Sequence, residues 1–316
     1  NNIGRKSKSL WTDNGEGEKV NYTLYENGYD EAEGVASGIA EYVRDGWNYN
    51  DVAILYRTNA QSRALEEKLM IHNIPYKIYG GQNFYQRKEI KDILAYLKTI
   101  DNGLDGQAVK RIINVPKRGI GNTTIDRLQE YADFNDITFW EALVNAKDID
   151  TIKNAALSKL ETFVDLIGRL RAKEEFMSLK ELAEAVIEDT GYIESLSQNE
   201  TVEEVEARRE NLDEFINKVV SYEEGCKEAG EEPTLSGLLE EVALIADIDN
   251  LDESEPHVML MTLHSAKGLE FPIVYMTGME DGLFPSYMTI VSDDSTEIEE
   301  ERRLCYVGIT RAEKIL

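Results

Sequence analysis

Two segments in the last sixty residues combine side chains that suit phosphate and nucleotide chemistry. The first is Val258-Met-Leu-Met-Thr-Leu-His-Ser-Ala-Lys-Gly-Leu-Glu-Phe-Pro272, where Thr262 and His264 follow an apolar run and Gly268 and Glu270 come next. Polar groups at the end of a strand in an open α/β sheet are well placed to contact a ligand. Taken alone, the same pattern also fits a strand end with a buried histidine and a surface Lys–Glu pair.

The second segment is Glu299-Glu-Glu-Arg-Arg-Leu-Cys-Tyr-Val-Gly-Ile-Thr-Arg-Ala-Glu313. Arg311 follows a small-residue turn near the end of a helix expected over about 298–312. From there a guanidinium can project into an interdomain cleft and stabilise charge on a transferred γ-phosphate, which is the role of an arginine finger. The alternative is a surface ion pair with Glu300 or Glu313. Arg303 lies on a nearby face and suits an intramolecular ion pair.

A third segment, Leu55-Tyr-Arg-Thr-Asn-Ala-Gln-Ser-Arg63, places four polar side chains at a strand-to-helix turn: Arg57, Thr58, Asn59 and Ser62. Hydroxyl and amide donors at a helix N-terminus suit a phosphate of a nucleic-acid backbone. The alternative is that Thr58 or Asn59 only caps the helix.

A fourth segment is Val115-Pro-Lys-Arg-Gly-Ile-Gly-Asn-Thr-Thr124. Its two glycines, Gly119 and Gly121, precede a helix expected to be capped by threonine, so consecutive backbone N–H groups are expected to face a phosphate. Lys117 and Arg118 add positive charge. Such a loop binds the nucleic-acid backbone without sequence preference. The alternative is an ordinary tight turn.

Together these segments, with Gly80-Gly-Gln-Asn-Phe-Tyr-Gln-Arg-Lys-Glu-Ile-Lys-Asp-Ile-Leu-Ala-Tyr-Leu97, resemble the PcrA/UvrD/Rep group of superfamily 1 DNA helicases over essentially all 316 residues. The four resemble motif V, motif VI, motif IVa and the GIG motif, in that order of description. The resemblance implies three sets of residues: for ATP, Gly268, Glu270 and Arg311; for single-stranded DNA, Arg57, Thr58, Asn59, Ser62, Thr262 and His264; for duplex DNA, Lys117, Arg118, Gly119, Ile120, Gly121 and Thr123.

The resemblance also implies an activity for a full-length parent protein. That parent uses ATP and Mg²⁺ to move 3′ to 5′ along single-stranded DNA, acts at a duplex junction in repair or replication, and has repair or replication proteins as possible partners. No Gly-x-x-x-x-Gly-Lys-Ser/Thr phosphate loop occurs in the sequence, so we expect domain 1A of the parent to hold ATP and the Mg²⁺ ligands to lie outside this chain. Domains 1A and 1B of the parent are the expected partner domains. We expect the chain to begin in mid-protein, to stop as a strand starts, and to be inactive alone.

Two other interpretations remain open. One is a subunit of a related helicase–nuclease, which shares motifs V and VI. The other is a non-catalytic docking module, in which acidic helices such as those in 200–214 bind a protein partner and the motifs are vestigial.

The elements that must position these residues fall into two patterns. A strand at 52–56, a helix at 60–73 and a strand at 75–79 indicate a parallel α/β sheet, and strand character returns at 258–263 and 271–277. From Arg87 to about Asp249 nearly every segment is helical; Ser178 and Glu181 form a capping box and Thr234 suits a helix cap. The sequence therefore predicts a discontinuous RecA-like domain 2A over 1–81 and 251–316. An all-helical inserted domain 2B covers 82–250, and Gly80-Gly81 serves as a hinge.

Composition sets further bounds. Hydrophobic residues make up 42% and charged residues 30%, which is typical of a globular protein. There is no apolar run of the roughly 20 residues that span a bilayer and no signal-peptide pattern, so no membrane association is expected. Two cysteines provide neither a disulfide framework nor a metal site, which fits a cytoplasmic location.

The net charge of −27 argues against nucleic-acid binding. Locally the balance reverses: residues 107–127 hold five basic side chains and one acidic side chain, a net charge of +4. A basic patch on an acidic protein favours localised, transient contact with DNA.

Overall fold

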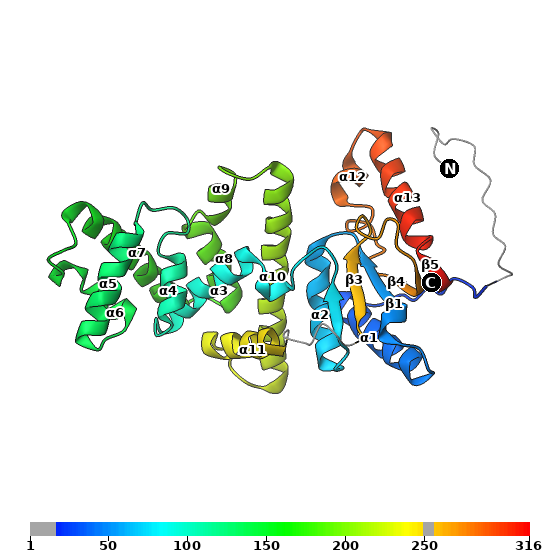
Figure 1. Ribbon diagram of the computed structural model, residues 1–316, viewed down its shortest axis with the longest axis horizontal. Coiled ribbons are helices and arrows are strands. Elements are labelled where there is room, and N and C mark those ends of the chain that lie inside the picture. The colour runs from blue at the N-terminus through cyan, green and yellow to red at the C-terminus, as the bar shows by residue number, and fades with distance from the viewer. Residues whose placement is uncertain (1–16, 249–255) are drawn as a thin grey trace. The chain divides into compact units, whose positions relative to one another are not determined.

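The computed structural model describes residues 17–248 and 256–316, which fall into two compact units (Figure 1). Unit 1 comprises Asn1–Phe84 and Ile248–Leu316, and unit 2 comprises Tyr85–Asp247. The confirmed fold class is a parallel α/β sheet with a large helical insertion. No helix in the described ranges is both long and apolar enough to cross a membrane.

Unit 1 alternates strands and helices on both sides of the insertion. Its elements are α1 (Gly28–Arg44), η1 (Tyr49–Asp51), β1 (Val52–Tyr56), η2 (Asn59–Gln61), α2 (Ser62–Ile71), β2 (Tyr76–Ile78), β3 (Val258–Thr262), β4 (Phe271–Met276), α12 (Tyr287–Val291), α13 (Ser295–Ile309) and β5 (Ala312–Ile315). The final helix therefore begins and ends about three residues earlier than its sequence predicts, because Asp294 accepts from Thr296 N and caps it.

The five described strands form one parallel sheet in the order β2-β3-β1-β4-β5. Strand β1 is central and buried along its whole length. Its VAILY sequence suits a strand covered on both faces, as parallel sheets require. Because all strands run the same way, their carboxyl ends share one edge of the sheet and their amino ends share the other.

Helices cover both faces of this sheet. On one face, Ala53 and Leu55 pack with Val274 and with Leu304 of α13. On the other, Tyr275 approaches Gly38 of α1 so closely that a Cβ there would lie 2.6 Å from the tyrosine oxygen. Helix α1 begins at the Asn27 cap, whose side chain accepts from Tyr29 N and Asp30 N, and it presents an apolar stripe to the sheet.

Unit 2 is helical throughout its described residues. Its elements, after η3 (Phe84–Gln86) at the boundary, are α3 (Lys88–Asp101), α4 (Gly106–Ile112), α5 (Asn122–Asn135), α6 (Phe139–Val144), η4 (Ala146–Asp148), α7 (Asn154–Glu174), α8 (Leu179–Asp189), α9 (Tyr192–Leu196), α10 (Val202–Ala229) and α11 (Leu235–Ile248). The Ser178 capping box is confirmed, and Thr234 Oγ1 accepts from Gly237 N at 3.1 Å at the start of α11.

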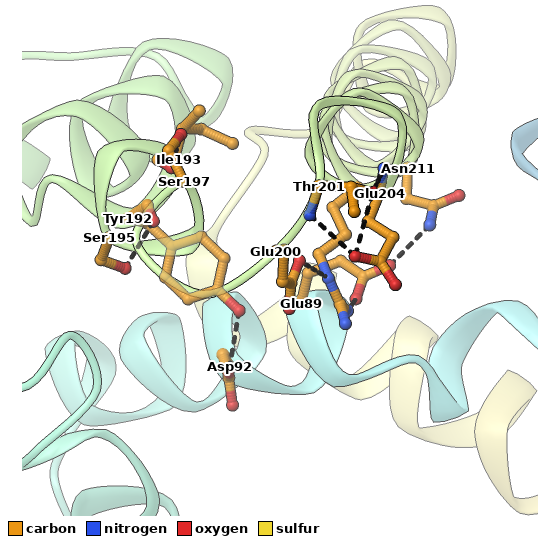
Figure 2. A network of polar contacts seen from close by, with 11 residues as sticks. Glu89, Asp92, Tyr192, Ile193, Ser195, Ser197, Glu200, Thr201, Glu204 and Asn211 are labelled. Carbon is orange, nitrogen blue, oxygen red and sulfur yellow. Dashed lines mark hydrogen bonds and ion pairs between the residues drawn. The ribbon is translucent and has the colours of Figure 1, made fainter.

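A buried polar network ties α3 to its neighbours in unit 2 (Figure 2). Glu89 accepts from Arg208 and from Asn211, both on α10, at 2.5 Å each. Asp92 accepts from Tyr192 Oη at 2.7 Å and from Arg111 Nε at 2.6 Å. The two carboxylates lie one helical turn apart on α3 and are 2% and 1% exposed. Since each is satisfied by partners from other helices, the network fixes how α4, α9 and α10 pack on α3.

Candidate nucleotide and nucleic-acid sites

The residues expected to contact single-stranded DNA come together at the carboxyl edge of the sheet. Strands β1 and β3 are direct neighbours with Tyr56 paired to Thr262, and Leu263 N donates to Tyr56 O at 2.8 Å. The segment after β1 and the segment after β3 therefore leave the sheet side by side, although some 200 residues separate them in the sequence.

Gln61 organises the turn after β1. Its Oε1 accepts from Arg57 N and Thr58 N, both at 2.9 Å. Thr58 is half-buried and Asn59 is exposed. Ser62 differs from its expected role: it is fully buried, and its hydroxyl donates to Glu66 Oε1 at 2.5 Å. The expectation that Ser62 contacts DNA is therefore corrected, because it braces the first turn of α2 and its hydroxyl is not accessible to a ligand.

Arg57 forms an ion pair that its sequence context did not indicate. Its Nε lies 3.1 and 3.2 Å from the two carboxylate oxygens of Glu301 on α13, and its Nη2 lies 2.9 Å from Oε1. The side chains are 25% and 10% exposed, respectively. This pair joins the end of β1 to motif VI.

His264 is exposed beside this pair and is not a buried core histidine. Partial desolvation, and then the positive charge of Arg57, lower the pKa of His264, while Glu301 and Glu300 oppose the shift. This shift favours the neutral imidazole, which can accept or donate a hydrogen bond. Thr262 is half-buried and also closes the turn after β3, since its Oγ1 accepts from Ser265 N at 3.2 Å and lies 3.0 Å from Ser265 Oγ.

The residues expected to contact ATP lie at the opposite, amino edge of the sheet. Glu270 immediately precedes β4 and Arg311 immediately precedes β5, and Phe271 N donates to Arg311 O at 2.9 Å. Glu270 is exposed. Gly268, with φ of +93°, gives the connection a left-handed residue that favours glycine. In the part of the chain that the structure describes, no ion pair joins Lys267 to Glu270.

The guanidinium of Arg311 is held by oxygen atoms of its own surroundings. Nε donates to Val307 O at 2.9 Å, Nη1 to Leu269 O at 2.8 Å, and Nη2 to Thr310 Oγ1 at 3.1 Å. These contacts use three of the five N–H donors of a guanidinium. Among residues 17–248 and 256–316 it forms no carboxylate pair, so the alternative pair with Glu300 or Glu313 is not present. Arg303 does pair with Glu300 at 2.7 Å and with Glu299 at 3.5 Å.

This donor set fits a nucleotide in chemical terms. A carboxylate such as Glu270 can accept from ribose hydroxyls, and the remaining donors of Arg311 can meet a phosphate oxygen. The described residues contain no group of three or more His, Cys, Asp or Glu side chains arranged to hold a metal ion.

The loop at 115–121 of unit 2 is shaped by Asn114, which sequence analysis did not single out. Asn114 Oδ1 accepts from Arg118 N at 2.8 Å and from Ile120 N at 3.2 Å. Lys159 Nζ on α7 donates to Gly119 O at 2.9 Å. Gly119 has φ of +72°. These contacts give the loop a defined shape before any ligand binds.

Two expectations for this loop are corrected. The Ile120 N–H is occupied by Asn114, and its side chain is 3% exposed, so it does not face a phosphate. No threonine caps the following helix, since Gly121 is its N-cap and no side chain caps it. Lys117, Gly119, Gly121 and Thr123 remain exposed.

Arg118 differs most from its expected role. Its guanidinium turns inward, donating to Ile112 O at 2.9 Å and Tyr96 Oη at 2.6 Å. It also lies over the Phe163 ring, 5.1 Å from the centroid. The charge expected to face a phosphate instead joins α3, α4 and α7 beneath the loop.

Gly80 and Gly81 lie in the turn after β2. Gly80 has φ of +72°, and a Cβ on Gly81 would lie 2.9 Å from Ile78 Cγ2. Both positions thus favour glycine for local reasons. Their service as a hinge stays a prediction.

Sequence analysis missed four residues that shape these sites. Two of them accept main-chain N–H groups through their side chains, namely Gln61 and Asn114. The other two contact a segment distant in the sequence, namely Glu301 and Lys159. A signal existed for Glu301, which lies within the segment 299–313, and for Asn114, which directly precedes the segment 115–124. None existed for Lys159, forty residues downstream of Gly119.

The five-stranded parallel sheet and the helical insertion define a RecA-like α/β domain that carries an inserted helical domain. The whole chain, residues 1–316, matches the UvrD-like helicase C-terminal domain, and it belongs to that family. It is 48% identical over 316 residues to an ATP-dependent DNA helicase PcrA of Staphylococcus aureus strain Mu50, covering 100% of this chain and 43% of the relative. A PcrA of Staphylococcus epidermidis strain RP62A is 46% identical over 315 residues, with 100% and 42% covered. The chain thus spans under half the length of these relatives.

Proposed function

We propose that this chain supplies the second half of an ATP-dependent 3′–5′ DNA helicase that acts in repair or replication in the cytoplasm. Units 1 and 2 correspond to domains 2A and 2B, and ATP with its Mg²⁺ is held by domain 1A of the parent protein. The observation that supports this most directly is the separation of chemistry in unit 1. Nucleotide-type donors lie at the amino edge of β4 and β5, whereas polar groups suited to DNA lie at the carboxyl edge of β1 and β3.

Each edge has a definite role in this proposal. At the amino edge, Arg311 stabilises charge on the γ-phosphate during transfer and Glu270 accepts from the ribose. At the carboxyl edge, Arg57, Thr58, Asn59, Thr262 and His264 hold the single strand through its backbone. Because the connection 263–270 joins the two edges, movement at the nucleotide is transmitted to the DNA within one segment.

In unit 2, the exposed face of the loop at 115–121 and the first turn of α5 hold the duplex ahead of the motor through Lys117, Gly119, Gly121 and Thr123. The contacts are to the backbone, so binding is independent of base sequence. The turn at Gly80-Gly81 lets the inserted domain change its orientation and regulate the motor.

The first test uses the parent protein with its nucleotide-binding domain. Arg311→Ala should lower kcat for ATP hydrolysis by about 10³-fold or more while DNA affinity is retained. Arg303→Ala is a suitable control, since that arginine pairs with Glu299 and Glu300 on the same helix. A loss below about tenfold for Arg311→Ala would assign it a structural role.

The second test uses this chain alone. Fluorescence anisotropy with a single strand, a blunt duplex and a duplex with a 3′ tail separates the two DNA surfaces. Gly119→Ala/Gly121→Ala should weaken the duplex-dependent part only, because Gly119 is left-handed and its Cβ would lie 2.8 Å from Lys159 Nζ. Equal loss for all three DNAs would contradict a separate duplex surface on the insertion.

A further inference from the structure

The ion pair between Arg57 and Glu301 uses one side of the Arg57 guanidinium and leaves its other side available to a ligand. Glu301 contacts Nε and Nη2, at 2.9 to 3.2 Å. In the described part of the chain, Nη1 of Arg57 has no partner. The Arg57 side chain is 25% exposed, whereas that of Glu301 is 10% exposed. A phosphate can therefore approach the open side of Arg57 while Glu301 stays in place.

The charge that such a phosphate meets is already balanced. Single-strand affinity comes largely from counterions released as cationic side chains neutralise phosphates. An arginine fixed to a carboxylate releases almost none, because the pair as a whole is neutral. It still offers directed N–H donors, so it contributes geometry to the site and little net attraction.

We propose that Glu301 is a positioning residue that sets the strength of the DNA contact at the carboxyl edge. It aims the open side of Arg57 toward the strand and cancels its charge, so that the contact is specific for a phosphate yet easily broken. This inference rests on the proposed single-strand role of that edge. For a protein that must release each phosphate as it advances, a neutralised arginine combines alignment with fast release.

The experiment measures binding of this chain to a 20-nucleotide oligothymidine by anisotropy between about 20 and 200 mM salt. Glu301→Gln removes the carboxylate charge and leaves a side chain of the same shape. It should steepen the slope of log affinity against log salt by about 0.7, one additional phosphate on a single strand. Affinity should then fall about fivefold more than in the wild type across that tenfold salt range.

Two controls match this variant. Glu301→Asp keeps the charge and should keep the wild-type slope. Glu300→Gln makes the same change in net charge one residue away, at the exposed pair with Arg303, and should also leave the slope nearly unchanged. A purely structural role for Glu301 would alter affinity without this charge-specific change in slope.

Arg57→Gln/Glu301→Gln tests the idea without leaving an unpaired charge, should the single variant fold poorly. Its slope should equal that of the wild type, because a neutral pair replaces a neutral pair. A slope shallower by about 0.7 in this double variant would show that Arg57 neutralises one phosphate in the wild type despite its pair with Glu301. The inference would then be wrong.

The outcomes separate this inference from the proposed function. If the wild type binds and Glu301→Gln has an unchanged slope, Glu301 does not tune the contact, but the DNA-binding edge stands. If no variant binds the oligonucleotide even at the lowest salt, the single-strand role of this edge and the inference both fail.

Discussion

Replacing Arg118 with alanine should destabilise unit 2 while having little direct effect on the charge that DNA meets, and Lys117→Ala should do the reverse. Arg118 makes two good hydrogen bonds, to Ile112 O at 2.9 Å and to Tyr96 Oη at 2.6 Å. Hydrogen bonds to a charged group contribute about 1.5–3 kcal/mol each. Because the side chain is only half-buried, we take the lower end, which gives a loss of about 3 kcal/mol.

Urea unfolding followed by the emission of Trp140 measures this loss within unit 2, in a background where Trp11 and Trp47 are phenylalanine. With a slope of about 2–3 kcal/mol/M, the midpoint should fall by about 1 M or slightly more. Lys117 is exposed and should change stability by less than about 0.5 kcal/mol when replaced by alanine. It should instead reduce the salt slope of duplex binding by about 0.9.

The opposite pattern would refute the reasoning. If Arg118→Ala retained the wild-type midpoint and lost the salt-dependent part of duplex binding, its guanidinium would face the DNA and not the helices. If both variants changed only stability, neither side chain would contact the duplex.

Three further predictions concern groups whose surroundings the structure defines. Asp92→Asn should cost about 3 kcal/mol of unit 2 stability in the same urea assay, because it leaves Arg111 without a charged acceptor. Gly278→Ala should cost about 1–2 kcal/mol for its φ of +67°. Its Cβ would also lie 2.0 Å from Nε2 of Gln61, so NMR should show shifted amide signals in the turn after β1. His264 should titrate below its usual 6.5, as NMR of its ring protons can test. Since the unfolded chain then binds more protons, its contribution to stability is present above 6.5 and lost as pH falls through the lowered pKa. A titration at or above 6.5 would contradict the lowered pKa of His264.

The sequence predicted the sheet of unit 1 well, because strands and helices are indicated by residues that are neighbours in the chain. The buried run at 52–56 and the strand-like runs near 258 and 271 required only alternation of strands and helices to indicate a parallel sheet. Adjacent strand ends then followed from topology, and they bring Arg57 and His264 to one edge. The direction of a long side chain does not follow in this way. Arg118 turns inward because its guanidinium donates to Tyr96 Oη and lies over the Phe163 ring. Both partners are distant from Arg118 in the sequence.

A second group of site predictions was wrong because the donor group is already bonded within the protein. Ser62 has the residue type of a phosphate contact, but its position in the first turn of α2 places it against Glu66. Ile120 has an N–H in a glycine-rich loop, but Asn114 accepts from it first. In both cases a neighbouring acceptor competes for a donor that the motif offers to a ligand. Such competition is decided by three-dimensional distance, which residue types alone do not encode.

The strand order has a consequence for how the chain folds during its synthesis. Strand β3 lies between β2 and β1, yet 180 residues separate Ile78 from Val258. At about 5–20 residues per second, the ribosome takes roughly 10–40 s to deliver it. Throughout that interval β1 and β2 lack the neighbour to which both bind. Unit 2 is continuous in sequence and can assemble meanwhile. The parallel sheet of unit 1 is therefore completed late, after the apolar strands β1 and β2 have been exposed without their shared neighbour.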